Sequence, residues 1–225
     1  PVLNLYRNSG SPADSDIIGD IKFTGRNDNS QDVTYAEIET VILDASDGTE
    51  DGYMNIYVMH GGTAQRSRIE MDSTETVFNE GSADIDFRVE SNGDANMLFV
   101  DGGNNRVGIG TGSPSYLLEA TAAGQAILSV TNSANDANGA SLYLRNTRTG
   151  SDNDEGGRIY FWADDDAGNA TECGLIVSTM TDVSNTTEDS RMDFKNLSNG
   201  SQYATVSMLG RNVGVGTLVP GVPLE

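Results

Sequence analysis

A short glycine-patterned segment that occurs twice constrains this chain more than any other feature. The first copy starts at Val107 and reads V-G-I-G-T, with a proline three residues after the threonine. The second copy starts at Val213, 106 positions later (213 minus 107), and reads V-G-V-G-T with a proline at the same spacing. Alternating β-branched residues and glycines predict a short strand with one face free of side chains, which lets another backbone approach closely. We assign a structural and assembly role to Val107, Gly108, Ile109, Gly110, Pro114, Val213, Gly214, Val215, Gly216 and Pro220.

A longer repeat accompanies this motif. Residues 7–56 align without a gap to residues 145–194, which lie 138 positions later (145 minus 7), with 15 identities in 50 positions. A G-x-I-x-F pattern starts at both Gly19 and Gly157, and T-E-D starts at both Thr49 and Thr187. Because internal repeats dictate architecture, we predict two related β-rich modules.

The offset of the longer repeat exceeds that of the glycine motif, so the first module carries an insertion. We place it at 72–104 and interpret it as one added hairpin. The predicted organisation is therefore module 1 at 1–111, a connecting shaft segment at 112–139 and module 2 at 140–225.

Short runs of β-branched and aromatic residues recur between turn formers, which is typical of an all-β chain. The strands expected in module 1 cover 2–7, 18–24, 34–43, 53–59 and 67–71. Those expected in module 2 cover 140–146, 157–163, 172–180, 191–195 and 203–208. Two more are expected at 117–121 and 126–130, with a short helix over 116–123 as the alternative. No stretch keeps a 3.6-residue apolar period over more than two turns, so helices are minor at most.

Composition indicates that apolar burial is completed between chains. Only 36% of residues are hydrophobic, a figure that excludes Gly, whereas the roughly 45–50% of typical domains includes it; 26 residues of this chain are Gly. The net charge of −21 disfavours nucleic acid and anionic membranes as partners, and no apolar run is long enough to be inserted in a membrane. Disorder is the alternative for an acidic, Gly-rich chain, but regularly spaced strand patterns favour a folded one.

Three features were candidates for catalytic or nucleotide chemistry, and none fits. A dinucleotide-binding loop needs G-x-G-x-x-G at the start of a helix, whereas the glycines of 108–112 are followed by Pro114. His60 is the only histidine, and the Gly-Gly pair after it predicts a strand end running into a turn rather than part of a catalytic relay. Cys173 takes the repeat position of Tyr35 without a basic neighbour, so we predict a buried small hydrophobe. We therefore predict that the chain is not an enzyme.

The acidic loops are the remaining ligand candidates. The loop at 44–51 offers several carboxylates at short spacing, as calcium sites do, but lacks the residue order of an EF-hand. Two interpretations stay open: the side chains cap turns, or they bind calcium or another cation. The candidate ligands are Asp44, Asp47, Glu50 and Asp51. No other cofactor is expected.

The V-G-I-G-T-x-x-P pattern of residues 107–114 resembles a segment found many times in tail-fibre and other appendage proteins of bacteriophages. The text at 82–91 and 97–101 is similar to the usual lead-in of that family, although the second motif departs from the pattern at Leu218-Val219 and Pro223. The resemblance implies an elongated, intertwined homotrimer within a virion. In such a trimer the glycine-bearing strand would lie near the axis, with Ile109 and Val215 buried between chains.

The resemblance and the shortage of apolar residues together favour a structural fibre segment of a phage virion appendage, which spaces or presents a host-receptor-binding tip. Its expected partners are two further copies of itself, other virion proteins, and a host surface glycan or receptor. Two alternatives stay open. One is a polysaccharide-degrading tailspike, which would use two of the 34 acidic residues, and the other is a cellular extracellular filament or adhesin that shares the repeat. The chain lacks an initiator Met and stops inside the second motif, so we expect it to belong to a longer protein.

Overall fold

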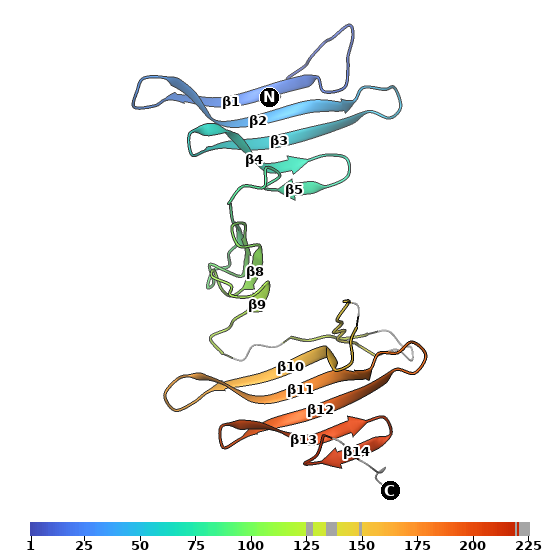
Figure 1. Cartoon of the computed structure of the whole chain (residues 1–225). Coiled ribbons are helices and arrows are strands. Elements are labelled where there is room, and N and C mark those ends of the chain that lie inside the picture. The colour runs from blue at the N-terminus through green and yellow to red at the C-terminus, as the bar shows by residue number, and fades with distance from the viewer. Residues whose placement is uncertain (125–127, 134–138, 149, 219, 221–225) are drawn as a thin grey trace. The chain divides into compact units, whose positions relative to one another are not determined.

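The computed structural model describes residues 1–124, 128–133, 139–148, 150–218 and 220. All regular secondary structure in this part of the chain is β-strand, which confirms the all-β prediction (Figure 1). Accordingly, no described helix could cross a membrane. The chain divides into two compact units, Pro1–Leu128 and Ser129–Glu225.

The first unit begins with a five-stranded antiparallel sheet in which each strand pairs with the next in sequence. Its strands are β1 (Ile17–Arg26), β2 (Asp32–Asp44), β3 (Asp51–His60), β4 (Thr63–Met71) and β5 (Thr76–Phe78). Reversals occur at turn-forming residues, such as Gly61 and Gly62 between β3 and β4, which both have positive φ. The sheet is a simple meander because each loop joins adjacent strands.

The same unit continues into a small four-stranded sheet. Its strands are β6 (Phe87–Val89), β7 (Leu98–Asp101), β8 (Arg106–Ile109) and β9 (Leu118–Ala120). Pairing is antiparallel except between β8 and β9, which are parallel. The expected strand at 117–121 is thus observed as β9, and the alternative helix is wrong, since Leu118 to Ala120 are drawn into the ladder beside β8.

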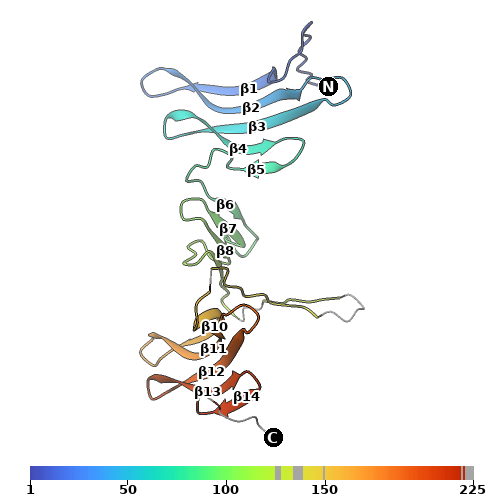
Figure 2. The same ribbon diagram turned by 45° about the vertical axis from the view of Figure 1, so that its right-hand side comes forward.

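The second unit holds another five-stranded antiparallel meander (Figure 2). Its strands are β10 (Asp154–Asp164), β11 (Ala170–Asp182), β12 (Asp189–Ser198), β13 (Ser201–Leu209) and β14 (Asn212–Val215). The bounds of β11, β12 and β13 follow those of β2, β3 and β4 at one constant offset, which is the offset of the longer sequence repeat. Irregularities in the ladder recur at the same offset, for example between Phe23 and Thr24 and between Phe161 and Trp162.

Two of the expected strands are wrong. Residues 2–7 and 140–146 form no strand, although each runs close to the first strand of a sheet. Arg7 Nη1 donates to the Ile17 carbonyl oxygen at 2.9 Å, and Asn146 Nδ2 donates to that of Glu155 at 3.1 Å. Side chains rather than backbone groups make these bonds, so no ladder forms. The expected strand at 126–130 lies partly outside the described residues.

Each sheet is a single layer, because within the described chain the strands contact chiefly their ladder neighbours. Among the described residues few apolar side chains are therefore buried; apart from Pro114 and Pro220, they are Val41, Phe99, Leu175 and Val177. Many large apolar side chains stay exposed instead, with Phe23 at 55% and Phe161 at 50%. This distribution leaves much apolar surface without a cover inside the chain.

Candidate functional site

The first V-G-I-G segment ends strand β8 and folds back over itself. Gly110 has a φ of +72°, a conformation that L side chains rarely adopt. A Cβ on Gly108 would lie 2.3 Å from the Thr111 carbonyl oxygen, so only glycine admits the returning chain. Arg106 Nη1 donates to the carbonyl oxygen of the buried Pro114 at 2.7 Å and closes the turn.

The second V-G-V-G segment builds the same turn from a different donor. Gly216 has a φ of +73°, and a Cβ on Gly214 would lie 2.7 Å from the Thr217 Cγ2. Asn212, at the position of Arg106, donates through Nδ2 to the Pro220 carbonyl oxygen at 3.2 Å. The motif is therefore a Pro-anchored turn in both units.

The two turns have different surroundings. Strand β8 lies between β7 and β9, and Thr121 N donates to the Ile109 carbonyl oxygen at 2.8 Å. A Cβ on Gly110 would lie only 2.1 Å from the Thr121 carbonyl oxygen. Strand β14 is an edge strand paired with β13 alone. In both motifs the next residues of the same chain, Thr111 or Thr217, occupy the space beside Gly108 or Gly214. These glycines are therefore needed for the fold of a single chain.

The β-branched residue between the two glycines of each motif, Ile109 or Val215, points to the face opposite the glycines. Ile109 is 47% exposed and Val215 is 75% exposed in the single chain. Both side chains are thus accessible to another molecule.

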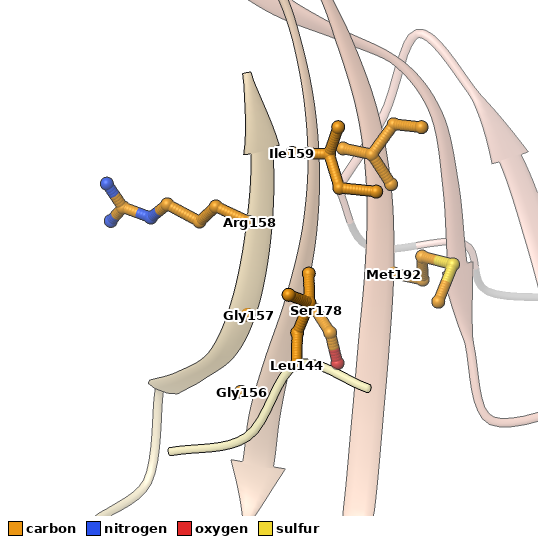
Figure 3. A pocket seen from close by; sticks show the side chains of 8 residues that line it. Leu144, Gly156, Gly157, Arg158, Ile159, Ser178 and Met192 are labelled. Carbon is orange, nitrogen blue, oxygen red and sulfur yellow. The ribbon is translucent and has the colours of Figure 1, made fainter. Parts of the chain in front are cut away.

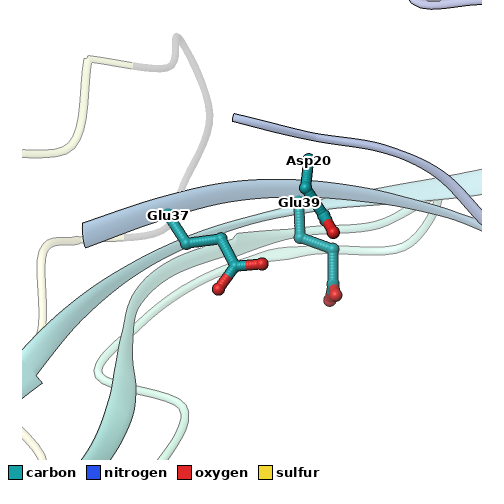
Figure 4. Close-up of side chains that lie close together, drawn as sticks. All are labelled: Asp20, Glu37 and Glu39. Carbon is teal, nitrogen blue, oxygen red and sulfur yellow. The ribbon is translucent and has the colours of Figure 1, made fainter. Parts of the chain in front are cut away.

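A cluster of carboxylates lies on one face of the first sheet, and sequence reasoning missed it. Oxygens of Asp20, Glu37 and Glu39 lie within 4.8 Å of one another, projecting from β1 and β2 (Figure 4). The Lys22 ammonium lies 3.1 Å from Glu37 and 3.4 Å from Asp20, and these partners raise its pKa, Glu37 most strongly. The cluster therefore contains its own cation. Only cross-strand pairing brings Asp20 opposite Glu39, so no local sequence signal announces it.

Polar side chains extend this cluster across β3 and β4. Asn55, which is 1% exposed, donates through Nδ2 to Glu70 at 2.6 Å and accepts from Ser67 Oγ at 2.6 Å. The Tyr57 hydroxyl donates to Glu39 at 3.3 Å, and burial is the main cause that raises the Tyr57 pKa. These hydrogen bonds link side chains of four strands, which suits a stabilising network, and among the described residues the buried Oδ1 of Asp20 is left without a hydrogen-bond partner.

The five-stranded sheet of the second unit has apolar side chains at positions where the first sheet has this carboxylate cluster. Leu175 and Val177 stand at the repeat positions of Glu37 and Glu39 and are buried. Fully buried Asp193 accepts hydrogen bonds on both oxygens from Arg191 Nε, at 3.0 and 2.9 Å. Because one module uses acids where the other uses aliphatic side chains, the cluster is not a feature that the two share.

The predicted cation loop at 44–51 uses its acids to hold its own turn. Asp44 accepts from Ser46 N at 2.8 Å and from Thr49 Oγ1 at 3.0 Å, and these bonds, those of Ser46 first, lower the Asp44 pKa. Glu50 accepts from Gly48 N at 3.1 Å. In the described chain, Asp44, Asp47, Glu50 and Asp51 do not form a compact group of three ligands. This geometry favours the turn-capping interpretation.

The predictions for His60 and Cys173 have different outcomes. His60 ends β3 directly before the Gly61-Gly62 turn, which confirms its predicted place. The prediction that Cys173 is a buried hydrophobe is wrong, since the side chain is exposed. Cys173 is the extra residue of a bulge, where Phe161 pairs with Gly174 and Trp162 with Glu172, so it has no ladder partner that would turn it inward.

The surface has several shallow hollows, and one of about 410 Å³ includes Asp44, Glu50 and Asp51 of the predicted cation loop in its lining. Another lies in the second unit, has a volume of about 200 Å³, and is lined by Leu144, Gly157, Ile159, Ile176, Ser178 and Met192 among others (Figure 3). Leu144 sits over Gly157, where an added Cβ would meet the Leu144 Cβ at 3.0 Å. The Arg158 side chain points away to the opposite face. The hollow is therefore an apolar recess rather than an acid–base site.

Each sheet carries a row of apolar residues that pair across its strands. We call these the apolar rows. The row of the first sheet is Ile21, Ile38, Ile56, Ile69 and Phe78. The row of the second five-stranded sheet is Ile159, Ile176, Phe194, Val206 and Val215. The row of the four-stranded sheet is Phe87, Val100, Val107 and Leu118. Two of the motif residues, Val107 and Val215, thus belong to apolar rows.

Comparison with models of known protein families finds no match to this chain, and comparison with curated protein sequences finds none either. The assignment of a function therefore depends on the residues and on their geometry.

Proposed function

We propose that this chain is a structural segment of a phage virion appendage, a tail fibre or similar fibre, which spaces or presents a host-receptor-binding tip. The observation that carries the proposal is repetition. Two sheets have the same strand order, and three strands of one have bounds equal to those of the other once the repeat offset is applied. The Pro-anchored turn also occurs twice. A chain that repeats one supersecondary unit is suited to an extended architecture.

We further propose that the segment works as a homotrimer in which the two β-rich units are modules of one intertwined fibre. The support is the exposed apolar surface of single-layer sheets, which is unfavourable in a lone soluble chain. The number three comes from the resemblance of the V-G-I-G-T-x-x-P turn to phage fibre proteins. Other virion proteins would adjoin the segment, and a host glycan or receptor would meet its exposed loops.

The proposed role is mechanical and needs no catalysis. The ionisable groups that lie close together, such as Lys22 with Glu37 and Arg191 with Asp193, pair across or along strands. The hollow of Figure 3 is apolar. The acidic surface would keep a long assembly soluble and limit binding to anionic cell surfaces.

The test has two parts. The first is the mass in solution by light scattering, which we expect to be three times 23.9 kDa, with resistance to proteases. A monomer that unfolds cooperatively would contradict the trimer. The second is immunogold labelling of purified virions and of cells, where label on cellular filaments and none on virions would favour the adhesin alternative. Release of reducing sugar from host polysaccharide would favour the tailspike.

A further inference from the structure

We propose that the apolar rows mark the surfaces through which copies of this chain bind one another. Each row-bearing face is covered by the corresponding faces of other copies, and the opposite, polar faces are directed to solvent. The inference relies on the proposed function only for the number of copies.

The first support is the separation of chemistry between the two faces of a sheet. In β1, Ile21 and Phe23 lie on the row-bearing face, and Asp20 and Lys22 lie on the other. The polar face of the first sheet already holds ion pairs and hydrogen bonds of its own, such as those of Lys22 and Asn55. The apolar rows contain no charged residue. The formal charge of −21 per chain is therefore carried by residues outside the apolar rows.

The second support is the area that is left uncovered. On the row-bearing faces of the two five-stranded sheets, ten large apolar side chains are 37–75% exposed. They are Ile21, Phe23, Met54, Val58, Phe78, Ile159, Phe161, Met192, Phe194 and Val215. If each exposes about 90 Å², which is roughly half of a large side chain, the sum is about 900 Å² per chain. A stable interface needs about 800 Å² from each partner.

The third support identifies the occupant. Three separate sheets in one chain carry the same kind of face, and in two of them the first three row positions repeat at the offset of the longer sequence repeat. A partner that covers all three faces must therefore have several apolar faces of its own. Another copy of this chain has one such face for each face of the first copy. The recess beside Leu144, of about 200 Å³, lies on such a face and has room for an apolar side chain of the facing copy.

The inference also gives the motif a second role. Val215 pairs with Val206 at the end of the row in the second sheet and is 75% exposed. The turn glycines position this strand end through contacts within the chain, and the valine then points toward the neighbouring copy. The motif would thus join the fold of one chain to the assembly of several.

The experiment compares two variants of adjacent residues on β10. Phe161 (50% exposed) lies on the row-bearing face, and Tyr160 (41% exposed) lies on the opposite face, where it pairs with Leu175. Both are accessible, so neither substitution creates a cavity in the chain. In the full chain, we expect Phe161→Glu to weaken self-association about 100-fold or more, because a charge would replace a buried aromatic ring. Tyr160→Glu should associate like the wild type. Light scattering over a concentration series measures both, and circular dichroism checks that the sheets persist.

Three results would overturn the inference. They are a wild-type chain that stays monomeric at high concentration, a Phe161→Glu variant that associates like the wild type, and equal weakening by both variants with intact sheets. If the chain stays monomeric and an unrelated protein binds to its Phe161 face, the inference is also overturned, because the face then serves another partner. Failure of the proposed function is separate. Self-association that Phe161→Glu abolishes, in a protein absent from virions, would uphold the inference and reject the appendage.

Discussion

Gly110 and Gly216 occupy equivalent places in the two turns, with φ of +72° and +73°, and only their surroundings differ. A Cβ on Gly110 would lie 2.1 Å from the Thr121 carbonyl oxygen. A Cβ on Gly216 would have no atom of the described chain within 4 Å. Substituting alanine at each position therefore separates the cost of the backbone conformation from the cost of the contact with β9.

The conformational cost is common to both variants. Holding an L residue in the left-handed region costs about 1–2 kcal/mol, and alanine recovers about 0.4–1 kcal/mol by restricting the unfolded chain. We therefore expect Gly216→Ala to cost about 1 kcal/mol of local stability. That corresponds to about a five-fold rise in the population of the opened turn.

Gly110→Ala adds the contact. The Thr121 carbonyl must retreat by about 1 Å, since real Cβ atoms stay more than 3.0 Å from such neighbours. This movement breaks the 2.8 Å bond from Thr121 N to the Ile109 carbonyl oxygen and loosens β9, which pairs over only three residues. Losing one or two such hydrogen bonds costs about 2 kcal/mol, so the total is about 3 kcal/mol.

Hydrogen exchange read by mass spectrometry measures both effects locally. Peptides that cover β7 to β9 should exchange about 100-fold faster in Gly110→Ala, and peptides that cover β13 and β14 about five-fold faster in Gly216→Ala. Peptides from β2 and β3 serve as the internal control and should not change in either variant. An equal increase in the exchange rate at the two turns would refute this reasoning, because the contact with the Thr121 carbonyl oxygen would then add nothing to the cost of the substitution.

Three further predictions concern ionisable groups of the first sheet. Lys22→Met should lower the melting temperature at pH 7 because Asp20 and Glu37 lose their cation, and a melting temperature equal to that of the wild type would count against it. The pKa of Asp44 is lowered, so its contribution to stability is present above about pH 4 and is lost as the pH falls through the folded-state value. Asp44→Ala should therefore differ from the wild type in melting temperature at pH 7 more than at pH 2, whereas Asp47→Ala in the same loop, which leaves the Asp44 hydrogen bonds in place, should match the wild type at both. The pKa of Tyr57 is raised by burial, so its contribution is present below about pH 10 and is lost above it, as the unfolded chain ionises first. Tyr57→Phe should reduce the fall in melting temperature between pH 9 and pH 11.5, and identical slopes would contradict this.

Local patterns of the sequence predicted much of the strand content. Alternation such as Ile21-Lys22-Phe23 sets which side chains share a face, because the period of a strand is two wherever the strand pairs. The expected strands at 18–24, 34–43 and 53–59 are accordingly observed as β1, β2 and β3. The Gly-Gly turn after His60 was readable for the same reason, since positive φ favours glycine regardless of distant contacts.

Features that depend on cross-strand register were decided by the tertiary structure. The extended segment at 2–7 has a strand-like composition but forms no ladder, because Arg7 bonds to the sheet through its side chain. Cys173 is exposed because the pairing of β10 with β11 leaves it as the extra residue of a bulge. Asp20 meets Glu39, and Lys22 meets Glu37, only once β1 has paired with β2.

The turn motif shows the same division. The order of valine, glycine and proline by itself determined a strand that stops abruptly and needs glycine. Which atoms make glycine necessary was decided by the fold, namely the Thr111 carbonyl over Gly108 and the Thr121 carbonyl beside Gly110. Backbone propensity is local and can be read along the chain, whereas a steric contact depends on where the returning chain passes.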